Sequence, residues 1–175
     1  MKEFIRFGLV LFIIASISAG ILSYVNVVTM PIIQSRDLAA QIEARKAVYK
    51  DADTFDENKK IEVDNYIFIP AFKGDKHLGY VVNGKAQGYG GEINFAFSFT
   101  LEGEIKGLKI LSAKETPGLG DKIFNEDWQK KWIGRDKSYK FKVGDDSFAG
   151  ATISPRGVYS EIIKILKLYD EKVKK

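Results

Sequence analysis

Two short segments of this sequence have residue types suited to binding a flat, charged ligand. In the first, residues 115–121, one proline and two glycines lie between an expected strand and an expected helix. Such a loop has a fixed shape and exposes backbone on both sides of Leu119, so it could offer peptide N–H groups and one apolar side chain to a flat ligand. An ordinary connection between a strand and a helix can have the same composition.

The second segment, residues 145–155, is a run of mostly small residues that opens onto the last expected helix. Ser154 is placed to cap this helix and Pro155 to begin it. A helix start carries unpaired N–H groups and the positive end of the helix dipole, which together favour a phosphate, and the small residues 149–151 allow the backbone to approach it. The hydroxyl of Thr152 would lie at that point. Helix capping alone also explains Ser154 and Pro155.

The composition excludes several kinds of site. The chain has 175 residues, no cysteine, one histidine and a formal net charge of +4. The lack of cysteine excludes disulfides, thiolate nucleophiles, iron–sulfur clusters and covalent c-type haem. A two-histidine metal site cannot form within the chain, and we expect neither a metal site nor a catalytic side chain. Most lysines lie beside acidic residues, and no basic stripe interleaved with aromatic residues is present, so we expect no binding to nucleic acid.

Four other features suggest structural roles only. His77 follows a turn and is expected to be an exposed loop residue. Asn83-Gly84 is expected to form a hairpin turn, which explains the near match of residues 79–85 to a phosphate-binding loop that has Ala86 where serine or threonine is required. The acidic residues 51–57 are expected to form a solvated loop rather than a calcium site. The two tryptophans are expected to lie in the core.

The N-terminal region is expected to be a membrane anchor. No charged residue occurs in the 29 positions between Arg6 and Arg36, whereas a spanning helix needs about 20 apolar residues. A cleaved signal peptide is the competing interpretation, because residues 15–20 offer small side chains for cleavage. The apolar run continues beyond them, which favours an uncleaved anchor. Counting charges alone does not decide the orientation, but a short basic head before a long apolar run favours export of the rest of the chain.

We therefore divide the chain into a membrane anchor at 1–30, an amphipathic helix and polar loop at 31–60, and a folded domain at 61–175. Pro31 is expected to close the apolar run, and the helix after it to bury Ile33, Leu38, Ile42, Ala44 and Val48. Large apolar side chains alternate with small or polar ones at 93–101, which predicts a half-buried strand. Further strands are expected at 66–69, 79–82, 105–111 and 139–143, and helices at 122–133 and 155–172. Antiparallel hairpins with flanking helices make this an α+β fold.

Three motifs follow one another along the domain: Gly88-Tyr89-Gly90-Gly91, Glu115-Thr116-Pro117-Gly118-Leu119-Gly120 and Ala149-Gly150-Ala151-Thr152. Together they resemble the FMN-binding domain family found in the G subunit of the Rnf ion-translocating oxidoreductase and in the C subunit of the related sodium-pumping NADH:quinone reductase. The anchor and the compact length are more similar to the Rnf protein. In that family FMN is linked by a phosphoester to the last threonine of a Ser/Thr-Gly-Ala-Thr motif, and Ala149 departs from it.

The resemblance implies a role for each of nine residues. Thr152 would carry FMN through a covalent phosphoester, and Ser147, Gly150 and Ala151 would lie near the phosphate. Glu115, Thr116, Leu119 and Gly120 would line the isoalloxazine ring, with Tyr89 as a stacking neighbour.

The resemblance also implies a cellular location, a complex and partners. The chain would relay electrons in a complex of the cell inner membrane that couples ferredoxin and NAD oxidoreduction to sodium or proton movement, with its domain on the periplasmic side and no catalysis of its own. Its partners would be the other membrane subunits and a flavin transferase. The alternative is a membrane-tethered binding or assembly module that uses the same pocket for a non-redox ligand, and an anchored hydrolase is less well supported.

Overall fold

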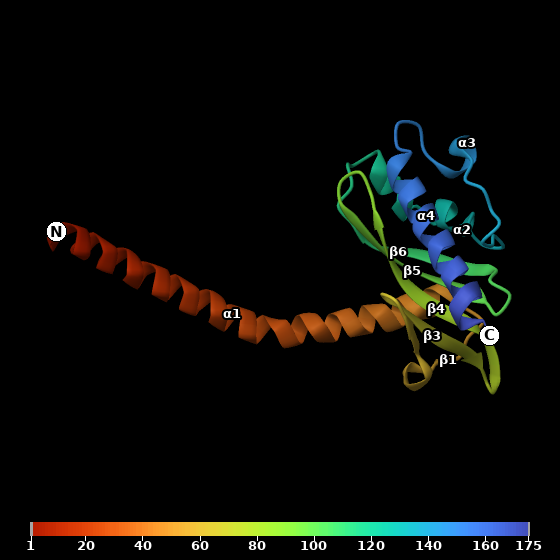
Figure 1. Cartoon of the computed structure of the whole chain (residues 1–175), viewed down its shortest axis with the longest axis horizontal. Helices are drawn as coiled ribbons and strands as arrows, with labels where there is room; N and C mark the ends of the chain where they lie inside the picture. The colour runs from red at the N-terminus through yellow and green to blue at the C-terminus, as the bar shows by residue number, and fades with distance from the viewer. Residues whose placement is uncertain (1, 175) are drawn as a thin grey trace. The chain divides into compact units, whose positions relative to one another are not determined.

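The structure is a computed structural model that describes the backbone of residues 2–174 and the side chains of residues 4–30 and 42–174. Contacts divide the chain into two compact units, Met1–Ile42 and Glu43–Lys175. The sheet and the shorter helices all belong to the second unit, as the colours and labels of Figure 1 show. The expected boundaries after residues 30 and 60 stay a prediction.

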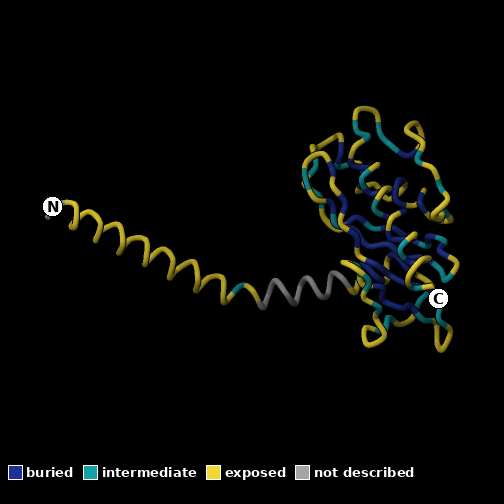
Figure 2. The backbone as a smooth tube through the Cα atoms, viewed as in Figure 1, coloured by how far each residue is buried: buried dark blue, intermediate teal, exposed yellow. Residues whose placement is uncertain are grey.

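Helix α1, Lys2–Val48, contains the expected anchor. Its segment Phe4–Met30 has 27 residues, a mean hydropathy of 2.2 and no buried residue, so it is long and apolar enough to cross a membrane. This stretch is yellow in Figure 2 except at Thr29, which is of intermediate burial and teal. The helix expected after Pro31 continues directly from the anchor, because α1 runs through Pro31 to Val48. Of the residues expected to be buried in the second part of the helix, Ala44 and Val48 are buried, whereas Ile42 is 43% exposed. The side chains of Ile33 and Leu38 lie outside the described residues.

The second unit is built on an antiparallel sheet of six strands. The strand order is β1-β3-β4-β5-β6, with β2 paired to β3, so β6 forms one edge. Hairpins join β3 to β4, β4 to β5 and β5 to β6. The strands are β1 Thr54–Phe55, β2 Ile61–Val63, β3 Tyr66–Lys73, β4 Lys76–Gln87, β5 Glu92–Thr100 and β6 Ile105–Ala113.

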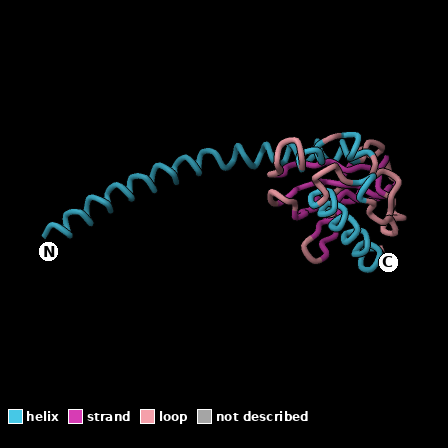
Figure 3. Tube along the Cα trace, turned by 90° about the horizontal axis from the view of Figure 1, so that it is seen from above, coloured by secondary structure: helices cyan, strands magenta, loops and turns pink. Residues whose placement is uncertain are grey.

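Helical segments lie on both sides of the strands (Figure 3), which confirms the predicted α+β fold. The last turn of α1 covers one face and α4 the other. The helical segments after α1 are η1 Glu57–Lys59, η2 Gly120–Phe124, α2 Glu126–Lys130, α3 Val143–Asp146, α4 Ile153–Leu168 and the π-helical turn η3 Tyr169–Val173.

Two expected elements differ from the structure. The helix expected at 122–133 is interrupted at Asn125, whose side chain accepts hydrogen bonds from the N–H groups of Asp127 and Trp128 and so begins α2 afresh. The strand expected at 139–143 is absent, because the segment instead bonds back to Asp146 at the end of α3. Both tryptophans are buried as predicted.

The alternating strand predicted at 93–101 is β5, and both of its faces are covered. Phe95, Phe97 and Phe99 pack into the main core with α4. On the opposite face Ala96 packs against Ala44 and Val48 of the last turn of α1. Small side chains on this face allow the helix to come close, and the hydroxyl of Ser98 donates a hydrogen bond to the Val48 carbonyl, which lies at the helix end and lacks a helical partner. The strand is therefore more buried than predicted.

The hairpin turn expected at Asn83-Gly84 is wrong, because β4 runs straight through these residues. Gly84 lies beneath the ring of Phe95, and a Cβ atom there would lie 2.3 Å from the ring. The glycine thus makes room for an aromatic side chain on the neighbouring strand. The turn is formed instead by residues 88–91, where the Gly88 N–H donates to the Gly91 carbonyl at 2.8 Å.

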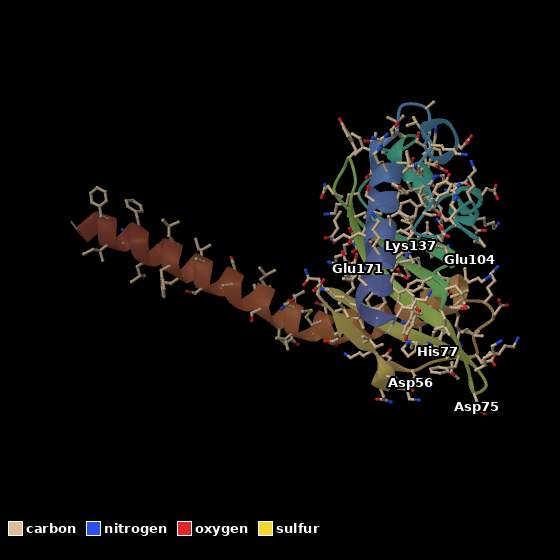
Figure 4. The ribbon with its side chains drawn as sticks, turned by 45° about the vertical axis from the view of Figure 1, so that its right-hand side comes forward. Asp56, Asp75, His77, Glu104, Lys137 and Glu171 are labelled. Atoms are coloured by element: carbon tan, nitrogen blue, oxygen red, sulfur yellow. The ribbon has the colours of Figure 1, made fainter. Side chains whose placement is uncertain are left out.

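His77 is not an exposed loop residue. It lies in β4, half-buried, with its ring stacked on Phe72 at a centroid distance of 5.0 Å and edge-on to Tyr80 at 4.9 Å. Figure 4 shows Asp75 at the tip of the β3–β4 hairpin and His77 further into the sheet. The turn predicted around residue 75 is correct, but the strand begins one residue before the histidine.

The close contact between β6 and α1 gives a testable prediction. A Cβ atom at Gly107 would lie 2.1 Å from the carbonyl oxygen of Val48. Gly107→Ala must therefore push α1 away from the sheet, and we expect it to lower the free energy of unfolding of the domain by about 3 kcal/mol. Urea unfolding followed by tryptophan fluorescence measures this loss. Gly144→Ala, where a Cβ meets no atom within 4 Å, is the control and should change stability by less than about 1 kcal/mol.

Candidate functional site

The three motifs meet at one cleft of about 250 Å³. Eight of the nine predicted site residues line it, and the ninth, Ser147, does not. The cleft is bounded by the β4–β5 turn, the loop after β6 and the start of α4. Its lining residues are Tyr89, Glu115, Thr116, Leu119, Gly120, Gly150, Ala151, Thr152, Ile153 and Ser154.

The loop after β6 contains a tight turn at its centre. The N–H of Leu119 donates to the carbonyl of Thr116 at 3.1 Å, and Gly118 has a φ of +78°. A type II turn requires a positive φ at its third position, here Gly118, and commonly has proline at its second. The turn presents Leu119, whose side chain is 42% exposed, at the cleft.

The carboxylate of Glu115 is packed between two glycines of different motifs. A Cβ atom at Gly88 would lie 2.1 Å from its Oε1, and a Cβ atom at Gly120 would lie 2.1 Å from its Oε2. The N–H of Gly90 donates to Oε1 at 3.4 Å, a long hydrogen bond. The Oε2 atom is buried without a partner in the described part of the chain. This orphaned acceptor beside the cleft can take a hydrogen bond from a ligand.

The turn before Thr152 also depends on a glycine. The N–H of Ala151 donates to the carbonyl of Phe148 at 2.9 Å. Gly150, between them, has a φ of +77°, a backbone angle that residues with a side chain rarely adopt. A Cβ atom at Gly150 would lie 3.5 Å from Leu119 Cδ2, so the two loops face each other across a short distance.

Thr152 itself occupies the N-cap position of α4, two residues earlier than the sequence predicted for the cap. Its side chain makes no capping hydrogen bond, so the hydroxyl is not used by the helix. The predicted cap, Ser154, is buried and its oxygen accepts a hydrogen bond from the N–H of Tyr89 at 3.1 Å. This bond joins the β4–β5 turn to the helix and leaves Tyr89 73% exposed at the cleft.

Ser147 does not reach the cleft, because its hydroxyl donates to the carbonyl of Val143 within α3. Its neighbour Asp146, which sequence reasoning missed, has a fully buried side chain. The carboxylate accepts hydrogen bonds from the Tyr139 hydroxyl and the Lys142 N–H, both at 2.7 Å, and lies 2.8 Å from Arg135. Nothing in the sequence distinguishes Asp146 from the exposed Asp145 beside it.

The pKa values of this cluster follow from its surroundings. Burial acts to raise the pKa of Asp146, but the Lys142 N–H, the Tyr139 hydroxyl and Arg135 together hold that pKa below its ordinary value. Burial and the hydrogen bond to Asp146 raise the pKa of Tyr139 to about 12. Asp146 therefore stays charged at neutral pH and fixes the segment that leads into the turn before Thr152.

Three larger surface hollows, of about 570, 460 and 440 Å³, lie elsewhere on the domain. None of the nine predicted site residues lines them. Volume alone does not identify a binding site, whereas the smaller cleft joins three motifs, a free hydroxyl and a buried carboxylate oxygen without a partner. We therefore take the cleft as the candidate site.

Known proteins are similar in sequence to this chain over nearly its full length. Residues 88–167 match the model of a family described as FMN-binding domain. The chain is 30% identical to the G subunit of the ion-translocating oxidoreductase complex of Shewanella piezotolerans, over 96% of this chain and 90% of that protein. It is 25% identical to the G subunit of the Na⁺-translocating ferredoxin:NAD⁺ oxidoreductase complex of Acetobacterium woodii, over 96% of this chain and 92% of that protein.

The fold is similar to a known one. The crystal structure of the C subunit of the Na⁺-translocating NADH-quinone reductase from Parabacteroides distasonis superposes with a TM-score of 0.50, over 61% of each chain and at 21% identity. At that level of identity the likeness concerns the fold alone.

The charge of Asp146 gives the second prediction. Asp146→Asn removes the negative partner of Arg135 from the interior, and we expect a loss of about 3 kcal/mol in the free energy of unfolding at pH 7. The pKa of Asp146 is lower in the folded than in the unfolded state. Its charge therefore contributes fully to the free energy of unfolding above about pH 4, and this contribution is lost as the pH falls through the folded pKa. The difference in the free energy of unfolding between the native protein and Asp146→Asn should therefore become smaller in acid.

Urea unfolding at pH 7 and at pH 3 measures both effects. Asp145→Asn, at the exposed neighbouring carboxylate, should change stability little at either pH. A difference for Asp146→Asn that is the same at both pH values would show that its charge does not stabilise the segment.

Proposed function

The chain belongs to the family of G subunits of the ion-translocating oxidoreductase complexes, and on this basis we propose that it relays electrons in such a membrane complex through FMN attached to Thr152. The observation that carries the proposal is the convergence of three motifs, distant in sequence, on one cleft. The relatives from Acetobacterium woodii and Shewanella piezotolerans bear names that describe ion-translocating oxidoreductases. The FMN-binding domain match covers every residue of the cleft.

The residues of the cleft fit the chemical parts of FMN. Leu119 and the exposed ring of Tyr89 offer apolar surface to an aromatic ring system. The unpartnered Oε2 of Glu115 is an acceptor for one of the N–H or O–H groups of the cofactor. The start of α4, a 16-residue helix, favours the charge of the phosphate, and Thr152 lies at that start.

The size of the cleft suits the relay of electrons. Sites that enclose most of a small ligand have volumes of about 300–1,000 Å³, so a cleft of about 250 Å³ leaves part of a flavin uncovered. When bound, FMN supplies electron transfer in steps of one or two electrons. The residues of this chain bind the cofactor, fix its orientation and exclude water from one side of it. This role requires no acid or base from the protein.

The position of Thr152 also suits covalent attachment. Its hydroxyl is not used in helix capping, and it lies where the helix dipole stabilises negative charge on a phosphate. In the attachment reaction the threonine oxygen would bond to the phosphorus of an activated flavin phosphate as the bond from phosphorus to its leaving group breaks, and the hydroxyl proton would pass to a base of the transferase. A flavin transferase is the expected catalyst. A permanent link would retain the cofactor in an exported domain.

We place the chain in the inner membrane, with segment Phe4–Met30 as a single span and the flavin domain on the periplasmic side. The basic residues before the span and the length of the apolar run support this orientation. The partners would be the other membrane subunits of the complex. Beyond the span, basic residues are interspersed with acidic ones, so we expect the anchor rather than charge to hold the domain at the membrane.

Attachment at Thr152 is the third prediction. The full chain produced together with an active flavin transferase should gain the mass of one FMN less one water and fluoresce on a denaturing gel. Thr152→Val keeps the shape of the side chain without the hydroxyl, and we expect no covalent flavin on it. Thr152→Ser restores a hydroxyl and should regain at least part of the fluorescence.

Fluorescence that persists in the denatured valine variant would place the link elsewhere. A colourless native chain produced beside an active transferase would favour the alternative, a membrane-tethered module for a non-redox ligand. Thr54→Val, at an exposed threonine outside the cleft, is the control and should leave the flavin content unchanged.

The orientation is the fourth prediction. Alkaline phosphatase matures only after export, so a fusion after Lys175 should be active. A reporter that works only in the cytoplasm, fused at the same position, should be inactive. The opposite pattern would place the flavin domain in the cytoplasm and would overturn the periplasmic relay.

A further inference from the structure

The edge of the sheet at β6 is open along most of its length. β6 is the last strand in the sheet, so only its inner side pairs with a strand, β5. Its first residue is covered on the outer side, because Ile105 exchanges backbone hydrogen bonds of 2.8 and 2.9 Å with Arg135 and Gly134. Across residues 106–113 no backbone hydrogen bond to a segment other than β5 is found within residues 2–174.

A groove of about 440 Å³ follows this open edge. Residues 106–109 of β6 form part of its lining, just beyond Glu104, which is labelled in Figure 4. Its other lining residues come from the end of α1 and the segment after it, and from α2 and the turn that follows. They are Ala47, Tyr49, Lys50, Asp51, Glu126, Gln129, Lys130 and Ile133. The groove is thus lined in part by a strand whose outer edge is unpaired, the arrangement in which an extended peptide can add to a sheet.

The groove is basic. Four lysines and two acidic residues line it. Lys106 pairs with Glu104 at 3.0 Å, and Lys130 lies 3.5 Å from Glu126. Lys50 and Lys109 form no ion pair with any residue whose side chain the structure describes. An acidic occupant would therefore complement the charge of the groove.

The same lysines disfavour a second copy of this chain as the occupant. If two β6 edges paired, their lysines would be brought together across the new ladder, and like charges opposite one another destabilise a sheet. Lysines on edge strands commonly protect against such pairing. The charge of the edge therefore favours a different protein as the occupant.

The register of β6 predicts the pattern of that occupant. Lys109 pairs with Ala96 and so lies on the face covered by the end of α1, whereas Leu108 pairs with Phe97 and lies on the face of the main core. An added strand would place alternate side chains on these two faces. Acidic side chains suit the face of Lys109, and apolar ones suit the other, where Ile133 is half-exposed.

We propose that the β6 groove binds an extended segment of another protein, with acidic and apolar residues in alternation, which adds to the sheet as a further strand. The edge supplies backbone hydrogen bonds, and the lysines select the charge of the segment. This docking site is separate from the cleft of the candidate site, since the two share no lining residue. It can therefore be tested on protein without flavin.

The test uses the full chain in micelles of a neutral detergent and a capped ten-residue peptide of alternating glutamate and valine. We expect the peptide to bind in a fluorescence polarisation assay and to slow amide hydrogen exchange in residues 106–113 by about tenfold or more. A peptide of alternating lysine and valine should not bind. The double variant Lys50→Glu/Lys109→Glu should weaken binding by about tenfold. The matched control Lys73→Glu/Lys76→Glu, at the β3–β4 hairpin, should leave it unchanged.

A peptide N-methylated at every second residue, on the side that faces β6, distinguishes strand addition from attraction by charge alone. It keeps the charges but cannot donate backbone hydrogen bonds to the edge, so we expect its binding to be lost. Equal binding of the methylated peptide, of the lysine peptide or of the double variant would overturn the proposal, as would no binding of the acidic peptide. Protection of 106–113 that rises with protein concentration alone would make a second copy the occupant.

Discussion

The candidate site depends on the packing of the Glu115 carboxylate between Gly88 and Gly120. Each glycine lacks the Cβ atom that would collide with a carboxylate oxygen, so the β4–β5 turn and the loop after β6 close around one acidic side chain. Because Ser154 accepts a hydrogen bond from the Tyr89 N–H, the start of α4 is drawn to the same place. The Oε2 atom of Glu115, which has no hydrogen-bond partner among the residues that the structure describes, is left as an acceptor for a ligand. A buried acceptor of this kind favours a ligand that offers a hydrogen-bond donor there.

The rest of the domain holds these loops in position. The aromatic face of β5 packs under α4, so the helix that begins beside Thr152 is fixed by the main core. The buried Asp146 ties the segment before the turn to Arg135 and Tyr139. The other face of the sheet, with Ala96 and Ser98, receives the last turn of α1. The site is thus built from loops on a rigid sheet, the usual way in which proteins position binding residues.

Much of this could be predicted from local patterns. The apolar run before Pro31, the alternation in β5 and the buried face of α4 each depend on residues close together in sequence. The break at Asn125 in the helix expected at 122–133 is local, but other errors arose where a distant residue decides the outcome. Asn83-Gly84 has the composition of a turn, yet Phe95 on the next strand makes Gly84 part of β4. Ser154 has the type of a helix cap, yet its partner is Tyr89, and Asp146 gave no signal because its three partners meet only after folding. The convergence of the motifs could be anticipated only through family resemblance.

A crystal structure of the flavinylated full chain would test the central claim most directly, because it would show both the linkage and the position of the ring. We expect continuous electron density from the Thr152 side-chain oxygen to the phosphate, with the ring beside Leu119 and a hydrogen bond from the flavin to the Glu115 carboxylate. Density for the ring outside the cleft, or a phosphate linked to another residue, would contradict attachment at Thr152 in this cleft.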